Sequence, residues 1–169
     1  EPHSTSELIG SALILSAQNA TLQGDVESSS LTQVLIYGKL RLLSGALLEC
    51  TASACAIELR SGTLMIEEST DIQGDVLDII VGEHAQIGGT VTVGDTVTMR
   101  VNDTLMLAST SDVSADELDI SAGSIVASGE VTIVASLAMT AITSVNVTSD
   151  GELECTALMC VLQLRAHDV

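Results

Sequence analysis

The chain has 169 residues, 46% of them apolar, and carries five basic against 23 acidic residues, a formal net charge of −18. This charge argues against nucleic-acid binding and against attachment to an anionic membrane surface, because both depend on lysine and arginine. No apolar run approaches the roughly 20 residues of a membrane-spanning helix, so membrane insertion is not expected.

Short apolar segments separated by turn residues predict β-strands along the whole chain. Many of them alternate apolar and polar residues, the pattern of a strand with one buried face. Gly followed by Asp or Glu marks several breaks between them. No apolar set keeps helical spacing, so the sequence predicts an all-β fold. In chain order the segments include 13–15, 35–37, 64–66, 76–81, 91–93, 97–99, 105–107, 118–120, 131–133 and 145–147.

The aromatic content limits the kind of core that these strands form. Tyr37 is the single aromatic residue of the chain, whereas globular cores draw much of their buried area from aromatic side chains. Leu, Ile, Val, Ala and Met must therefore fill the interior. Narrow stacked layers suit that composition better than a wide globular core.

Two internal repeats indicate how the strands are arranged. Residues 21–26 recur as 71–76, and residues 49–60, which contain two cysteines, recur as 154–165 at an offset of 105. That offset divides into five turns of about 21 residues, and three strands of about seven residues give the same coil length. We therefore predict a three-sided, right-handed parallel β-helix of about eight coils of about 21 residues.

This β-helix is expected to form a single domain over residues 1–169. With parallel strands about 4.8 Å apart, its body would be about 40 Å long. The segment 27–32, with three consecutive serines, fits the strand pattern poorly and is expected to be a corner loop. Because the chain begins with Glu1 and shows no signal peptide, we interpret it as a mature product or as a segment of a longer solenoid.

The four cysteines form two pairs, Cys50 with Cys55 and Cys155 with Cys160. Five coils separate the pairs, about 24 Å by the strand spacing. A disulfide needs Cα atoms within about 7 Å, so within a solenoid only the two local pairs can form, each at a corner. The same separation argues against a zinc site. Four reduced thiols in a cytosolic protein are the alternative.

All three asparagines of the chain begin a glycosylation sequon: Asn19-Ala20-Thr21, Asn102-Asp103-Thr104 and Asn146-Val147-Thr148. Together with the paired cysteines, this predicts a secreted eukaryotic glycoprotein. Their spacing is close to four and two coils. We therefore expect all three on one side of the solenoid, about half a coil from the cysteine corners. Coincidence in a threonine-rich chain is the alternative.

Neither catalysis nor a bound cofactor finds support in the sequence. His3, His84 and His167 do not form part of a recognisable triad or metal-ligand cluster. A polysaccharide-cleaving β-helix would need more basic and aromatic residues. Calcium in the turns stays open, although the glycine-rich calcium-binding repeat is missing. Thr90/Thr92 and Thr96/Thr98 resemble the pairs of ice-binding solenoids, but they lie one strand apart and should face different sides.

The repeated Glu-Cys-Thr-x-x-x-Cys corners and the sequons resemble those of secreted parallel β-helix proteins of algal and protist surfaces, including flagellar-hair (mastigoneme-type) proteins. Bacterial adhesin solenoids are the second choice, because they seldom carry paired cysteines. The resemblance implies a structural, assembly or adhesion role and transfers no catalytic residue. It therefore favours a non-enzymatic structural glycoprotein of a cell surface or appendage.

The expected partners follow from the two ends of the chain. Neither end offers an amphipathic capping helix, and an uncovered terminal coil exposes strand edges and core. We therefore expect end-to-end self-association, or assembly with other extracellular matrix or fibre proteins. A glycan-binding adhesin or a polysaccharide-active β-helix is the main alternative, and an ice-binding solenoid a minor one.

Overall fold

The computed structural model describes residues 7–156 and 161–166. None of these residues is helical, and no helix that could span a membrane is found among them. They form the strands β1 (Glu7–Ala17), β2 (Ala20–Leu22), β3 (Asp25–Leu42), β4 (Leu47–Cys50), β5 (Ala56–Ile66), β6 (Asp71–Val81), β7 (Ala85–Ile87), β8 (Thr90–Leu107), β9 (Asp112–Ala127), β10 (Glu130–Val147), β11 (Glu152–Cys155) and β12 (Val161–Ala166).

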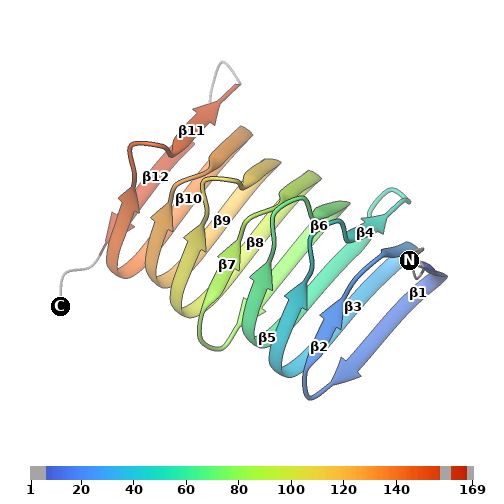
Figure 1. Cartoon of the computed structure of the whole chain (residues 1–169). Coiled ribbons are helices and arrows are strands. Elements are labelled where there is room, and N and C mark those ends of the chain that lie inside the picture. The colour runs from blue at the N-terminus through green and yellow to red at the C-terminus, as the bar shows by residue number, and fades with distance from the viewer. Residues whose placement is uncertain (1–6, 157–160, 167–169) are drawn as a thin grey trace.

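The strands form one continuous parallel sheet that winds about a single axis. Its order is β1-β3-β4-β6-β5-β7-β8-β9-β10-β11, with β2 paired to β3 and β12 to β10. Figure 1 shows the coils stacked side by side, with β1 at one end and β11 and β12 at the other. The predicted β-solenoid is confirmed, as about seven turns of about 20 residues where the sequence predicted about eight of 21.

Each coil has three strand segments, which β8 illustrates. Its pairing with β9 consists of three regular stretches. The register shifts between Thr92 and Thr96 and again between Val101 and Thr104. We call residues 90–93 and their equivalents in other coils segment A, residues 96–101 segment B, and residues 104–107 segment C. The A–B and B–C corners lie at the two register shifts, and a turn follows segment C.

Aliphatic side chains at alternate positions of each segment fill the interior. In β8 the side chains of Val91, Val97, Met99, Leu105 and Leu107 are all fully buried. Each stacks on its register partner in the next coil, about 4.8 Å away. Burying one such side chain contributes about 1.5–3 kcal/mol. The aliphatic layers expected from the near absence of aromatics are therefore what the structure contains.

The prediction of a corner loop over residues 27–32 is wrong for most of that segment. Residues 25–42 are continuous strand β3, and only Ser29 and Ser30 lie at the A–B corner, between the residues paired to β4 and those paired to β5. Ser28 and Thr32 face the interior, where their hydroxyls form a 2.7 Å hydrogen bond. That bond satisfies both buried hydroxyl groups and so lets the serine-rich stretch continue the coil.

Candidate functional site

A disulfide joins Cys50 and Cys55 at the A–B corner, as the sequence predicts. Cys50 ends β4 and Cys55 directly precedes β5, and their Cα atoms are 5.6 Å apart. Five residues, 51–55, connect the two segments here, whereas the preceding coil needs only residues 29–30. The disulfide therefore closes the longer form of this corner.

Neighbouring coils hold this disulfide corner from both sides. In the preceding coil, the side chain of Ser28 places its Oγ 3.2 Å from Cys50 Sγ. In the following coil, the carboxylate of Asp75 accepts a hydrogen bond from the backbone N–H of Ala54. Ala54 has a φ of 62°, a left-handed conformation that is costly for a residue with a Cβ. The corner is thus fixed by a covalent bond, a buried hydroxyl and a carboxylate.

Of the second cysteine pair, Cys155 lies five coils from Cys50, as the internal repeat predicts. Cys155 ends β11 and is disulfide-bonded, while Cys160 lies outside the described residues. No group of three or more His, Cys, Asp or Glu side chains that could hold a metal ion occurs within the described part of the chain. Register pairs lead in five steps from Glu49, the residue before Cys50, to Glu154, the residue before Cys155; the residues between them are Gln73, Thr92, Ser114 and Thr132.

The three sequon asparagines are exposed and lie on one flank of the solenoid. Asn19, between β1 and β2, and Asn102, within β8, occupy the B–C corner of different coils. Asn146 lies in segment C of β10, paired with Val126. Segment B separates this flank from the disulfide corner. Glycosylation at these three positions stays a prediction.

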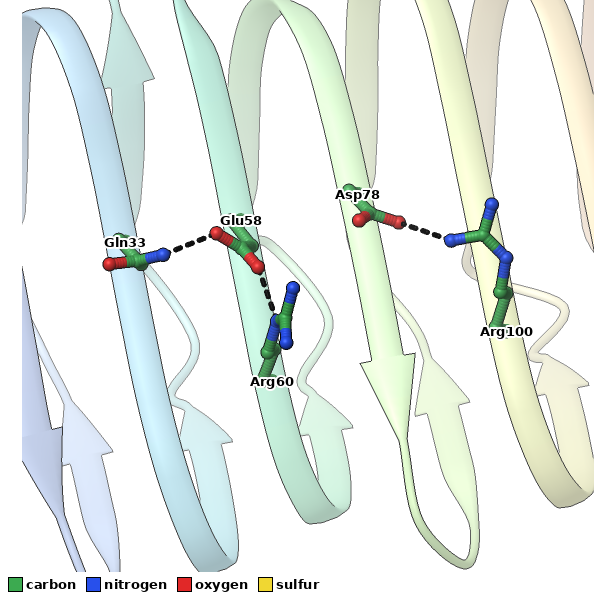
Figure 2. Close-up of polar contacts among 5 residues, drawn as sticks. All are labelled: Gln33, Glu58, Arg60, Asp78 and Arg100. Atoms are coloured by element: carbon green, nitrogen blue, oxygen red, sulfur yellow. Dashed lines mark hydrogen bonds and ion pairs between the residues drawn. The ribbon is translucent and has the colours of Figure 1, made fainter.

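A row of polar side chains crosses the outer surface of segment B, as Figure 2 shows. Gln33 Nε2 donates a hydrogen bond to Glu58 in the next coil, and Arg60 Nε donates to the same carboxylate. Farther along the axis, Arg100 Nη1 lies 3.4 Å from Asp78 Oδ1. The arginines offset the repulsion that stacked Glu58 and Asp78 would otherwise exert across adjacent coils. This row joins stacked coils and has the geometry of a structural contact.

Sequence reasoning did not find this row of polar side chains. Its members are separated by 25 residues for Gln33 and Glu58 and by 22 for Asp78 and Arg100. Gln33 and Glu58 are register partners, whereas Arg100 lies two residues beyond Thr98, the register partner of Asp78, and corner lengths also vary from coil to coil. Only the strand register therefore brings these side chains together. A separation near one coil length is the weak signal in the sequence that could have indicated the row.

A further ion pair joins Arg41, in segment C of β3, to Glu67, in the turn after β5. The Arg41 guanidinium donates a hydrogen bond to the Glu67 carboxylate, and the backbone N–H of Ser44 donates a second at 3.3 Å. Both stabilise the ionised carboxylate, so they hold the pKa of Glu67 below its ordinary value, the Arg41 bond contributing most.

His84 contacts an acidic residue at the B–C corner. Its Nδ1 lies 3.5 Å from Asp103 Oδ2, and both side chains are more than half exposed. Within the described residues the imidazole has no hydrogen-bonded serine or cysteine that could act as a nucleophile. The geometry is that of a surface contact between two coils.

Two surface grooves flank the B–C corner. One has a cavity volume of about 500 Å³ and runs from Tyr37 past Arg60 to Ile80 on segment B. The other, of about 400 Å³, lies on segment C between Lys39 and Met106. Both are within the size range of small-molecule sites, roughly 300–1,000 Å³.

Comparisons of this chain with known proteins found no matching protein family, no curated relative and no solved structure with similarity to it.

Proposed function

We propose that this chain is a non-enzymatic, extracellular structural glycoprotein that contributes to a surface fibre by stacking of β-solenoid coils. The observation that carries the proposal is the apolar surface of β1. Leu15, which faces the axis, is 36% exposed, whereas its register partner Val34 in the next coil is 2% exposed. Within the described residues nothing stacks on the outer edge of β1. A further coil, from this chain or another copy, would bury this layer and pair the strand edge.

The far end of the described solenoid has a similar surface. Leu164 in β12 is 45% exposed and Val147 in β10 is 36% exposed, and among the described strands β11 and β12 pair only with β10. Free parallel edges with apolar side chains are suited to the addition of further coils. Both outer coils of the described part therefore favour a continuous stack.

The disulfide and the sequons support an extracellular setting for this stack. The Cys50–Cys55 bond is of the kind that persists in oxidising compartments. The exposed sequon asparagines on a flank away from the disulfide corner would place sugars on the side of a fibre, where they leave the stacking ends free.

The test of this proposal is negative-stain electron microscopy of native material together with sedimentation of two aspartate variants. Leu15→Asp places a charge in the layer that a stacked coil would bury. Ile14→Asp adds the same charge to the same strand, at the exposed neighbouring position whose partner Gln33 lies on the outer surface. We expect filaments from the native protein, a loss of assembly of about tenfold or more in Leu15→Asp, and no loss in Ile14→Asp.

Two results would contradict a fibre. One is native material that consists only of short, separate rods. The other is equal assembly of the two aspartate variants. A melting temperature that rises with one specific free sugar, in a protein that forms no filaments, would favour the glycan-binding adhesin instead.

A further inference from the structure

The only tyrosine of the chain lies exposed at the B–C corner. Tyr37 is 75% exposed, although the chain has no other aromatic side chain with which to build its core. A large aromatic ring left in solvent forgoes the stabilisation that burial would provide, and the groove beside Tyr37 would let a ligand cover the ring. A ligand for this ring should therefore lie close to the corner.

The surroundings of Tyr37 leave room for such a ligand. The groove beside it is bordered by Leu35, Arg60 and Ile80, while the next two coils place Gly62 and Gly82 at the corner. A Cβ at Gly62 would lie 2.8 Å from the carbonyl oxygen of Gly38, so a side chain there would not be accommodated without movement. Close stacking therefore keeps Gly62 without a side chain, and Gly82 also has none, so the groove beside the ring stays open.

Asn19 lies at the same corner in the preceding coil. Gly38, which follows Tyr37, donates its N–H to Gln18 O at 2.7 Å, and Lys39 donates its N–H to Asn19 Oδ1 at 2.8 Å. These bonds fix Asn19 within one coil spacing of Tyr37. Within the described residues Asn19 Nδ2 has no hydrogen-bond partner.

N-glycosylation is compatible with this arrangement of Asn19. In that reaction Nδ2 forms a bond to the anomeric carbon of a sugar on a lipid-linked pyrophosphate donor, the pyrophosphate leaves, and Nδ2 loses one proton to solvent. The Oδ1 atom is not consumed, so it continues to accept the Lys39 hydrogen bond. The attached sugar starts at the corner one coil before Tyr37, and the groove continues from the ring over the next two coils.

We propose that the first sugars of the glycan on Asn19 lie against the ring of Tyr37 and occupy the groove beside it. This inference rests on the glycosylation that is part of the proposed function. The C–H groups of a pyranose face pack on an aromatic face, and Arg60 offers N–H donors to sugar hydroxyls beyond the Nε that binds Glu58. The glycan is thereby held along the side of the solenoid.

Asn102 provides an internal comparison. It occupies the B–C corner as Asn19 does, but its neighbouring coils place Gly82 and Gly123 there. The ring of Tyr37 lies three coils away, about 14 Å by the strand spacing, so the first sugars of a glycan on Asn102 do not reach it. The inference therefore requires that the two glycans behave differently.

Tyrosine fluorescence tests this difference, because Tyr37 is the sole aromatic emitter of a chain without tryptophan. The chain is produced in a host that glycosylates, and occupancy is measured by mass spectrometry. Thr21→Ala removes the Asn19 sequon but keeps the Asn19 side chain; Thr104→Ala does the same for Asn102. We expect acrylamide quenching of Tyr37 to increase about twofold in Thr21→Ala and to stay unchanged in Thr104→Ala.

Nuclear magnetic resonance supplies a second measurement. Sugar protons of the Asn19 glycan should show ring-current shifts that Tyr37→Ser abolishes, and those of the Asn102 glycan should not. An unoccupied Asn19, or an occupied Asn19 with unchanged quenching and no ring-current shift, overturns the inference. A free saccharide that binds at Tyr37 while the glycan is attached to Asn19 also overturns the inference. Filament formation is measured separately, so a failure here is distinguishable from a failure of the fibre proposal.

Discussion

At the scale of single residues, polar side chains on this solenoid act mainly between coils. Arg41 and Glu67 are 26 residues apart in sequence, yet their side chains meet because one coil stacks on the next. The same holds for Arg100 and Asp78. Because the net charge is −18, each such pair also offsets part of the repulsion among the carboxylates of the chain. Individual exposed pairs nevertheless contribute little to stability.

The Arg41–Glu67 pair predicts a specific dependence of stability on pH. The pKa of Glu67 is lowered in the folded state, chiefly by the Arg41 hydrogen bond. Its contribution is therefore fully present above the ordinary glutamate pKa and is lost as the pH falls through the lower folded value. We expect the melting temperature of the natural chain to exceed that of Glu67→Gln near neutral pH, with the difference shrinking in acid.

The matched control for this prediction is Glu68→Gln, which removes the same charge from the exposed neighbouring residue. It accounts for the general effect of lowering a large negative charge. Melting curves recorded between pH 7 and pH 3 should separate the two variants at neutral pH and bring them together in acid. A constant separation over the whole range would refute the role of the pair.

At the scale of the elements, corner length is what varies from coil to coil. The A–B corner takes two residues in β3 and five between β4 and β5. Two-residue corners keep the parallel pairing on both sides and so remain part of one long strand. The five-residue corner interrupts the strand, and the Cys50–Cys55 bond and a hydrogen bond to the Asp75 carboxylate hold it.

Removal of this disulfide should therefore destabilise the chain modestly. Its loop is short, so in the chain-entropy model its contribution lies at the low end, about 2 kcal/mol. We expect Cys50→Ala/Cys55→Ala to lower the guanidinium midpoint while the slope of the transition stays the same. Ser53→Ala, an exposed change at the same corner, serves as the control. A midpoint equal to that of the natural chain would show that the corner holds without its covalent bond.

At the scale of the whole molecule, stability comes from contacts between adjacent coils. Strands β8 and β9 are paired on both sides, whereas β1 pairs on one side with β3. In such a stack the stability of a coil is roughly the sum of its own folding and its interfaces with its neighbours. A coil with one neighbour should therefore open more readily than a coil with two.

Hydrogen exchange read by mass spectrometry checks this gradient. We expect amides of β8 and β9 to exchange slowest and those of β1, β11 and β12 fastest in dilute protein. Once filaments form, β1 should become protected, because another coil then covers its edge. Uniform protection along the chain, or a β1 that is unaffected by assembly, would contradict a stack held by coil-to-coil contacts.

The fold was predictable from the sequence because its two main signals are local. Alternation of apolar and polar residues indicates strands, and the repeat of residues 49–60 as 154–165 indicates the coil length. The disulfide between Cys50 and Cys55 followed from that coil length, because it leaves no other cysteine within reach. The segment 27–32 was mispredicted because Ser28 and Thr32 satisfy each other inside the core, which their polarity did not reveal.

The sequence by itself thus determined the all-β solenoid, a coil of about 21 residues where the structure has about 20, and the cysteine corner, because periodicity and repeat spacing are properties of the chain alone. Only the tertiary structure decided which distant residues meet: Gln33 with Glu58, Arg41 with Glu67, and Asn19 with the corner of Tyr37. The physical reason is that corner lengths differ between coils. The register across coils is therefore set by how the buried aliphatic layers stack, and a fixed repeat length does not reproduce it.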